Sequence, residues 1–160
     1  MYNDAHSTPT LEVLLKRAES IVNGSTAHAR TEWERNHCID WVMSLIDEDG
    51  YPTASMITAS RADGFKWLTF CTGTGWNKPN RIERDPRTCI YLFDEPSFTG
   101  ISLTGKTEVL TDEGIKRQMW YDELGASFTG PKDPRWCVLR FVPERYNIFI
   151  DDHTIRGTFD

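Results

Sequence analysis

The residues with the clearest chemistry form a loop between an apolar run that ends at Cys71 and a polar run that begins at Asn77. Glycines let backbone N–H groups approach a ligand closely, and threonine hydroxyls can hydrogen-bond to it. The loop residues are Thr72, Gly73, Thr74, Gly75 and Trp76. Lys78 follows at the expected start of a helix, where free N–H groups and the helix dipole favour an anion. This combination predicts a site for one phosphate group.

The same residues also fit a turn followed by a solvated basic helix face, and the motif alone leaves that interpretation open. A P-loop is excluded because Lys78 does not follow the glycines at the spacing that motif requires. The sequence shows no Rossmann fingerprint, no Ser-His-Asp arrangement and no metal-ligand spacing. We therefore predict no particular catalytic residue and no metal ligand.

The elements that must position this loop begin with a predicted helix over 9–22, in which apolar residues recur at helical spacing. Thr8 is its expected N-cap, and Pro9 suits the first helical position. A polar connection from Ser25 to about Asn36 should follow.

Short apolar or alternating runs, separated by turn sequences, then predict about six antiparallel strands in a mainly β chain with flanking helices. The predicted strands are 39–45, 52–60, 65–71, 88–93, 99–110 and 136–142, with 146–150 as a further candidate. A short helix over 79–84 and a second helix over 112–124, capped by Thr111, lie between them. Closure removes exposed strand edges, which favours a closed or partly closed barrel, while a two-sheet sandwich also fits the pattern.

Length and composition limit the class of protein. The 160 residues fit a single domain over 1–160, and a net charge of −6 argues against nucleic acid or an anionic membrane as partner. The first nine residues are polar and no apolar run is long enough to cross a bilayer. Four widely spaced cysteines are predicted to be buried free thiols: Cys38, Cys71, Cys89 and Cys137. Together these features predict a cytoplasmic protein.

The order of these features resembles the FMN-binding split β-barrels of the pyridoxamine 5′-phosphate oxidase-like superfamily, in particular the general stress protein branch. That family has a G-x-P strand, a strand ending in F/S-T, a lysine six residues later, and then N/D-P-x-V/C. The matching residues are Gly50 with Pro52, Phe70 to Thr72, Lys78, and Asp85 to Cys89. ISLTGKTEVLTD and WCVLRFVP resemble two later strands of the family, so the resemblance covers about residues 39–150.

The resemblance implies a split barrel with its core at about 37–150 that binds FMN at a homodimer interface. Lys78 corresponds to the family's phosphate-contacting lysine, and 55–58 to the strand along the ribityl chain and isoalloxazine. The implied cofactor-binding residues are Ser55, Met56, Ile57, Thr58, Thr72, Trp76, Asn77, Lys78 and Trp120.

Two residues depart from the family pattern. Ser55 replaces a frequent phosphate-binding arginine, and Trp76 replaces a small hydroxyl residue, so Arg81 or Arg84 is a candidate for the missing charge. Across the dimer interface, the candidates to pack on the ring are Trp120, Phe128 and Trp136. Ordinary core packing is the alternative for each of them, and for Trp136 it is the favoured one.

The activity implied is that of an FMN-dependent oxidoreductase of unknown substrate, with a nicotinamide or another small molecule as docking substrate. The Arg-Leu-Ala-Pro-type segment of true pyridoxamine 5′-phosphate oxidases is missing near the C-terminus, so that particular reaction is not expected. Two alternatives stay open. One is a non-catalytic flavin-binding stress-response protein, and the other is a related split barrel that binds haem or a deazaflavin.

Overall fold

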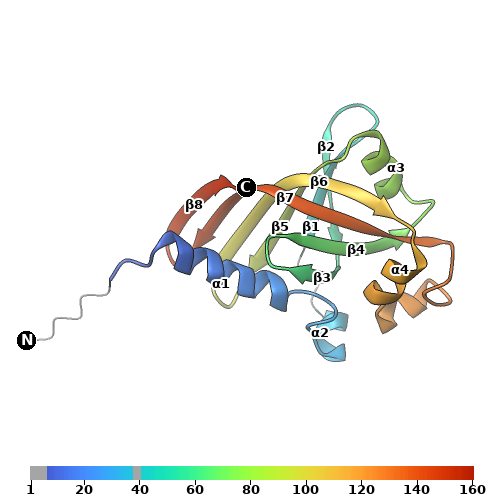
Figure 1. Ribbon diagram of the computed structural model, residues 1–160, viewed down its shortest axis with the longest axis horizontal. Coiled ribbons are helices and arrows are strands. Elements are labelled where there is room, and N and C mark those ends of the chain that lie inside the picture. The colour runs from blue at the N-terminus through green and yellow to red at the C-terminus, as the bar shows by residue number, and fades with distance from the viewer. Residues whose placement is uncertain (1–6, 38–40) are drawn as a thin grey trace, which may run out of the picture.

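In the computed structural model, which describes residues 7–37 and 41–160, the chain forms an antiparallel sheet of eight strands with helices around it (Figure 1). The strands are β1 (Trp41–Ile46), β2 (Pro52–Ile57), β3 (Ala59–Asp63), β4 (Trp67–Gly73), β5 (Arg87–Asp94), β6 (Thr99–Leu110), β7 (Trp136–Ile150) and β8 (His153–Thr158). The helices are α1 (Leu11–Gly24), α2 (Glu32–His37), α3 (Asn77–Arg84), α4 (Glu113–Met119) and the 3₁₀ helix η1 (Asp122–Ala126).

The sheet curls because its two ends are consecutive in the chain. The strand order is β2-β1-β5-β6-β7-β4-β3, with β8 paired to the second half of β7. β2 and β3 stand at opposite ends of this order, yet Thr58 alone separates them in sequence. The chain must therefore bring the two edges of the sheet together, which makes the molecule a split β-barrel. This confirms the predicted barrel and excludes the sandwich.

Alternation along the strands directs apolar side chains to the inside of the barrel. In β1, Trp41, Met43 and Leu45 are buried and the residues between them are half-buried. α1 adds Leu14, Ala18 and Val22 to the same core, and the Trp41 Nε1 donates to the Ser25 carbonyl at 2.9 Å. Figure 1 shows α1 along one side of the sheet, with α3 and α4 toward the other end.

A second apolar cluster lies on the outer face of β4 and β7. Its buried members are Cys71, Met119, Leu124, Phe128, Trp136 and Val138. α4 and η1 supply two of these side chains, so they cover a part of the sheet that would otherwise expose apolar surface. Burial raises the pKa of the Cys71 thiol to about 12 and that of Cys137 to about 11, which keeps both protonated at neutral pH. Cys89 is half-buried, and Cys38 lies outside the described residues.

Several predicted boundaries were wrong for local reasons. α1 begins at Leu11 rather than 9, because Thr10 is its N-cap and its Oγ1 accepts from the Val13 N–H at 3.3 Å. Part of the predicted polar connection is helical, since Thr31 and Glu34 cap α2 reciprocally. The predicted strand 52–60 divides at Thr58 into β2 and β3.

The C-terminal half also differs from the prediction. Asp112 caps α4, not Thr111, and the helix ends at Met119 before η1 begins. Residues 136–150 form one strand rather than two, and β8 was not predicted. The number of strands is therefore eight among the described residues rather than about six. No helix in the described part of the chain is long and apolar enough to span a membrane.

Candidate functional site

The predicted phosphate loop connects the end of β4 to the start of α3. The Trp76 N–H donates to the Gly73 carbonyl at 3.1 Å and closes a turn. Trp76 is the N-cap of α3 with an extended backbone, and its side chain makes no capping hydrogen bond. The first N–H groups of α3 therefore lack a side-chain acceptor, and such groups bind anions.

Lys78 is the second residue of α3 and is half-buried. Within the described residues, its ammonium makes no hydrogen bond or ion pair. Burial, and to a lesser extent the positive charge of Arg81, lowers the pKa of Lys78. A partly desolvated cation without a counter-charge is unfavourable, and a bound anion would relieve it.

The two arginines of α3 are already paired. The Arg81 Nε lies 3.2 Å from a Glu48 carboxylate oxygen and its Nη1 donates to the Thr53 hydroxyl at 3.1 Å. Arg84 reaches the same carboxylate at 3.7 Å. The hydrogen bond from Arg81 lowers the pKa of Glu48. Both arginines thus hold α3 against the β1–β2 hairpin, and Lys78 is the basic residue of this helix without a carboxylate partner.

The two threonines of the loop have structural roles. Thr72 is buried opposite Cys137 in the ladder between β4 and β7. The Thr74 hydroxyl donates to the Pro134 carbonyl at 2.9 Å and its N–H donates to the Arg135 carbonyl at 2.8 Å. Thr74 therefore fastens the segment 129–135 to the phosphate loop, and the structure does not bring the Thr72 hydroxyl to the surface.

Trp76, two residues before Lys78, has an exposed aromatic side chain. Its side chain is 56% exposed and its ring lies directly on Gly73, where an added Cβ would be 2.5 Å from the ring. Gly73 thus makes room for this indole. The ring centroid of Trp76 lies 6.0 Å from that of Phe128.

The predicted flavin strand lies next to α3. Ser55 and Met56 are exposed on β2, Ile57 is buried, and Thr58 is half-buried at the break before β3. Ser55 follows Thr53 on the same face of β2, since both pair with residues that point into the barrel. The hydrogen bond from Arg81 to Thr53 therefore places the strand and the helix of the predicted site side by side.

The other aromatic candidates pack within the subunit. Trp120 is half-buried, with its ring 5.6 Å from that of Trp136, and the ring of Phe128 lies 6.3 Å from that of Trp136. Trp136 is fully buried and its Nε1 donates to the Gly130 carbonyl at 3.0 Å. Core packing accounts for Trp136 and Phe128, while Trp120 keeps part of its surface open.

Sequence reasoning missed the support that segment 129–135 gives to the loop. Lys116 is buried, its Nζ donates to the Asp133 carbonyl at 2.6 Å, and it lies 4.7 Å from the Trp136 ring centroid. The Asp133 carboxylate accepts from the Thr129 N–H at 2.9 Å and from the Arg135 guanidinium at 2.6 Å. The carboxylate contacts of Asp133 are local, whereas Lys116 comes from α4, so this support depends on a contact between two elements that no local motif indicates.

An exposed aromatic patch, consisting of Tyr91, Phe93, Phe98 and Phe149, was also not predicted. These residues are 38–66% exposed and lie on the outer face of β5 and β7 or in the β5–β6 hairpin. Phe98 lies 5.3 Å from Phe93 and 6.1 Å from Phe149 between ring centroids. Its φ of 49° is unusual for a residue other than glycine.

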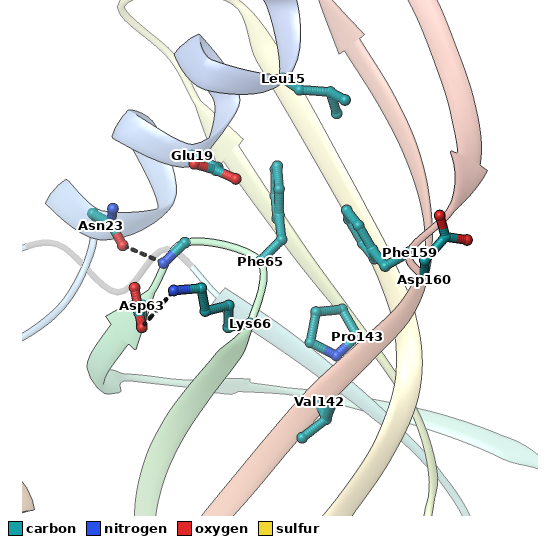
Figure 2. Close-up of a pocket in the computed structure, with 11 residues that line it drawn as sticks. Leu15, Glu19, Asn23, Asp63, Phe65, Lys66, Val142, Pro143, Phe159 and Asp160 are labelled. Carbon is teal, nitrogen blue, oxygen red and sulfur yellow. Dashed lines mark hydrogen bonds and ion pairs between the residues drawn. The ribbon is translucent and has the colours of Figure 1, made fainter. Parts of the chain in front are cut away.

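A further hollow lies apart from the phosphate loop and shares no lining residue with it. It measures about 610 Å³ and is bounded by α1, the β3–β4 turn, the middle of β7 and Phe159 (Figure 2). Lys66 is paired with Asp63 at 3.5 Å, and the Asn23 side chain accepts from the Gly64 N–H. These contacts pair part of its polar lining, and the hollow lies between α1 and the barrel. The described residues contain no cluster of ligating side chains suited to a metal ion.

Comparison with known proteins places this geometry in a family. The family model described as pyridoxamine 5′-phosphate oxidase matches residues 28–149. No curated protein matches the chain. Among solved structures, a Clostridium acetobutylicum protein described as related to general stress protein 26, of the pyridoxinephosphate oxidase family, superposes with a TM-score of 0.75 at 23% identity. The match covers 94% of this chain and 98% of that one.

Two further similar structures carry different ligand descriptions. A Nostoc punctiforme protein described as pyridoxamine 5′-phosphate oxidase-related and FMN binding has a TM-score of 0.59 at 12% identity, covering 96% of this chain and all of that one. A haem-binding protein from Mycobacterium smegmatis has a TM-score of 0.67 at 16% identity, covering 95% of this chain and 59% of that one. At these identities the likeness shows the fold.

Proposed function

The chain belongs to the pyridoxamine 5′-phosphate oxidase family, and from this premise we propose that it is a flavoprotein that binds FMN. The observation that carries the proposal is Lys78, a half-buried ammonium without a counter-charge in the first turn of α3. A phosphate monoester fits this position because it supplies the negative charge and the acceptors that the lysine and the free N–H groups lack.

The remaining residues of the site would bind the less polar parts of the cofactor. β2 offers Ser55 and Met56 on an exposed strand beside α3. Trp76 adds an exposed indole two residues from Lys78, and Asn77 begins the helix between them. Bound FMN would supply hydride or electron transfer. The chain would bind and orient it and restrict its contact with water.

The proposal includes a homodimer. The aromatic patch exposes four aromatic side chains together, and aromatic residues are enriched at protein interfaces. Its four residues are Tyr91, Phe93, Phe98 and Phe149, and Met56 is exposed on β2 as well. The family resemblance, in which flavin binds between subunits, supports a second copy of the chain as the partner.

The reaction proposed is oxidoreduction, with a nicotinamide or another small molecule as substrate. A flavin-binding protein without turnover is the alternative, and added NADH or NADPH distinguishes the two by bleaching or not bleaching the flavin. We place the protein in the cytoplasm, since the described cysteines Cys71, Cys89 and Cys137 are free thiols.

The absorption spectrum tests the cofactor. The spectrum is recorded on the protein as purified, or after reconstitution with FMN and desalting. We expect flavin absorption bands whose intensity corresponds to about one flavin per chain. A Soret band after reconstitution with haem, without retention of FMN, would contradict the proposal and favour the ligand described for the Mycobacterium relative. Retention of a deazaflavin in preference to FMN would contradict it as well.

A further inference from the structure

The outer face of β6, β7 and β8 carries a polar hollow that is not part of the proposed FMN site. Its volume is about 530 Å³. Six side chains that point away from the core line it, two from each strand: Ser102 and Thr104, Arg145 and Asn147, Arg156 and Thr158. Leu103 lies between Ser102 and Thr104, Tyr146 lies between Arg145 and Asn147, and both are buried in the barrel core.

The strand register places these six side chains in two adjacent rows. Ser102 is opposite Asn147, which is opposite Arg156. Thr104 is opposite Arg145, which is opposite Thr158. Arg145 and Arg156 are therefore diagonal neighbours on paired strands, a relation that separates the backbone positions by about 7–8 Å. Long side chains from such positions reach a common point.

The hollow has an excess of positive charge and hydrogen-bond donors. All six side chains carry N–H or O–H donors, and none of the residues that line the hollow is acidic. Within the described residues, neither Arg145 nor Arg156 makes an ion pair or hydrogen bond through its guanidinium. Other arginines are paired with carboxylates: Arg17, Arg35, Arg81, Arg84, Arg87 and Arg135.

Two adjacent guanidinium groups without a counter-ion repel each other. The chain has more acidic residues than basic ones, 24 against 18, yet it places no carboxylate in this hollow. A guanidinium binds carboxylate or phosphate oxygens through two parallel hydrogen bonds. We propose that this hollow binds a small dianion, either a phosphate monoester or a dicarboxylate. One charged end would lie between Arg145 and Arg156, with the hydroxyls of Ser102 and Thr104 as further donors.

This site is separate from the phosphate loop, since the two share no residue, and it does not depend on FMN binding. It lies at the rim of the aromatic patch, because Phe149 is two residues from Asn147 on the same face of β7. The competing occupant is a carboxylate from a second copy of the chain, and the experiment is designed to detect it.

The test is calorimetric titration at constant ionic strength with inorganic phosphate and, separately, with succinate. All proteins carry Lys78→Ala, which removes the proposed FMN phosphate contact. We expect saturable binding of at least one probe, weakened about tenfold or more by Arg145→Gln and by Arg156→Gln. Arg145→Lys should bind at an intermediate level, since it keeps the charge without the paired donors. Arg117→Gln, an exposed arginine on α4, is the matched control and should bind like its parent.

Binding of phosphate, of succinate or of both that Arg145→Gln and Arg156→Gln weaken supports the proposal and identifies the class of dianion. Binding that neither substitution weakens would overturn it. Absence of saturable binding would overturn it, as would equal weakening by Arg117→Gln. A change of molecular mass in the Arg145→Gln or Arg156→Gln proteins, without binding of either probe to the parent, would assign the arginines to contacts between subunits. That result would also overturn the dianion site. None of these outcomes depends on whether the chain retains FMN.

Discussion

At the scale of single residues, Lys78 supplies the positive charge of the candidate site and Trp76 supplies an aromatic side chain. Lys78 combines partial burial with a missing counter-charge, which is the property that an anion site requires. Trp76, two residues earlier in the chain, is exposed. The two fully buried tryptophans, Trp41 and Trp136, face the core and cannot approach a ligand without unfolding.

Trp76 should therefore report FMN binding. Flavin bound at Lys78 is expected to quench the tryptophan fluorescence, and Trp76→Phe should remove the largest part of that quenching while FMN affinity changes less than tenfold. Trp33→Phe, which alters an exposed tryptophan on α2, serves as control. Fluorescence titration of the three proteins measures both quantities. Undiminished quenching in Trp76→Phe would place the flavin elsewhere.

The position of Lys78 at the start of α3 was predictable, because strand, loop and helix are contiguous in sequence and need no tertiary information. The role of Thr74 was not, because its hydroxyl is bound by the Pro134 carbonyl from a segment 60 residues away. Thr72 was read as a ligand-facing hydroxyl, although its alternation with Phe70 directs it into the barrel. The pairing of Arg81 and Arg84 with Glu48 likewise depends on a contact between α3 and the β1–β2 hairpin.

At the scale of elements, β7 and β8 show where local signals mislead. Residues 136–142 and 146–150 were predicted as separate strands, but Pro143 between them pairs with Gly105 at an irregularity in the ladder, where a bulge tolerates a missing N–H. A Cβ at Gly105 would lie 2.0 Å from the Val142 carbonyl oxygen, so the close approach of the β6 and β7 backbones at this point requires glycine. β8 follows a two-residue turn in which Asp151 and Asp152 both have positive φ. Asp-Asp is a weaker hairpin signal than Asn-Gly, and the strand escaped prediction.

Segment 129–135 should make part of the stability depend on pH. The Arg135 guanidinium, followed by the Thr129 and Arg135 N–H groups, holds the pKa of Asp133 well below its usual range. A carboxyl whose pKa is lowered by folding stabilises the fold above its ordinary pKa of about 3.9, and this contribution is lost as the pH falls below that value. Asp133→Asn should therefore lower the urea midpoint at pH 7, and the deficit relative to the parent should be smaller at pH 3, because the contribution decreases progressively as the pH falls toward the lowered pKa.

The matched control is Asp63→Asn, which removes an exposed ion pair with Lys66 and should have a small effect at either pH. Urea unfolding of the three proteins at both pH values makes the comparison. If the deficit of Asp133→Asn were the same at pH 3 as at pH 7, the ionised carboxylate would not be the source of the stabilisation.

At the scale of the whole molecule, closure through Thr58 fixes the split barrel and leaves one aromatic surface uncovered. Alternating strands and tight turns predicted a barrel or a sandwich, since closure removes exposed edges, and the family resemblance implied the split barrel. The aromatic patch was not predicted, since its members come from β5, the β5–β6 hairpin and β7 and meet through sheet pairing alone. In the sequence, outward-facing apolar residues that a helix covers cannot be distinguished from those that stay exposed.

The patch leads to a test of the dimer. Light scattering at micromolar concentration should give twice the chain mass of 18.4 kDa. Phe98→Gly removes the central ring of the patch and suits the left-handed backbone there, so it should keep the fold and weaken the dimer at least tenfold. Tyr51→Ala, an exposed aromatic before β2, is the control. If the parent were a monomer and still bound about one FMN per chain, this would contradict an FMN site shared between two subunits.

The central claim is that Lys78 holds the phosphate of FMN, and one comparison of affinities tests it most directly. FMN and riboflavin are titrated into the parent, Lys78→Ala, and Lys66→Ala as an exposed-lysine control. A charge-assisted contact is worth about 1.5–3 kcal/mol, so Lys78→Ala should weaken FMN binding about ten- to a hundredfold. Riboflavin, which lacks the phosphate, should bind the parent more weakly than FMN and be nearly unaffected by the substitution. Unchanged FMN affinity in Lys78→Ala, or equal affinity of the parent for FMN and riboflavin, would contradict the account.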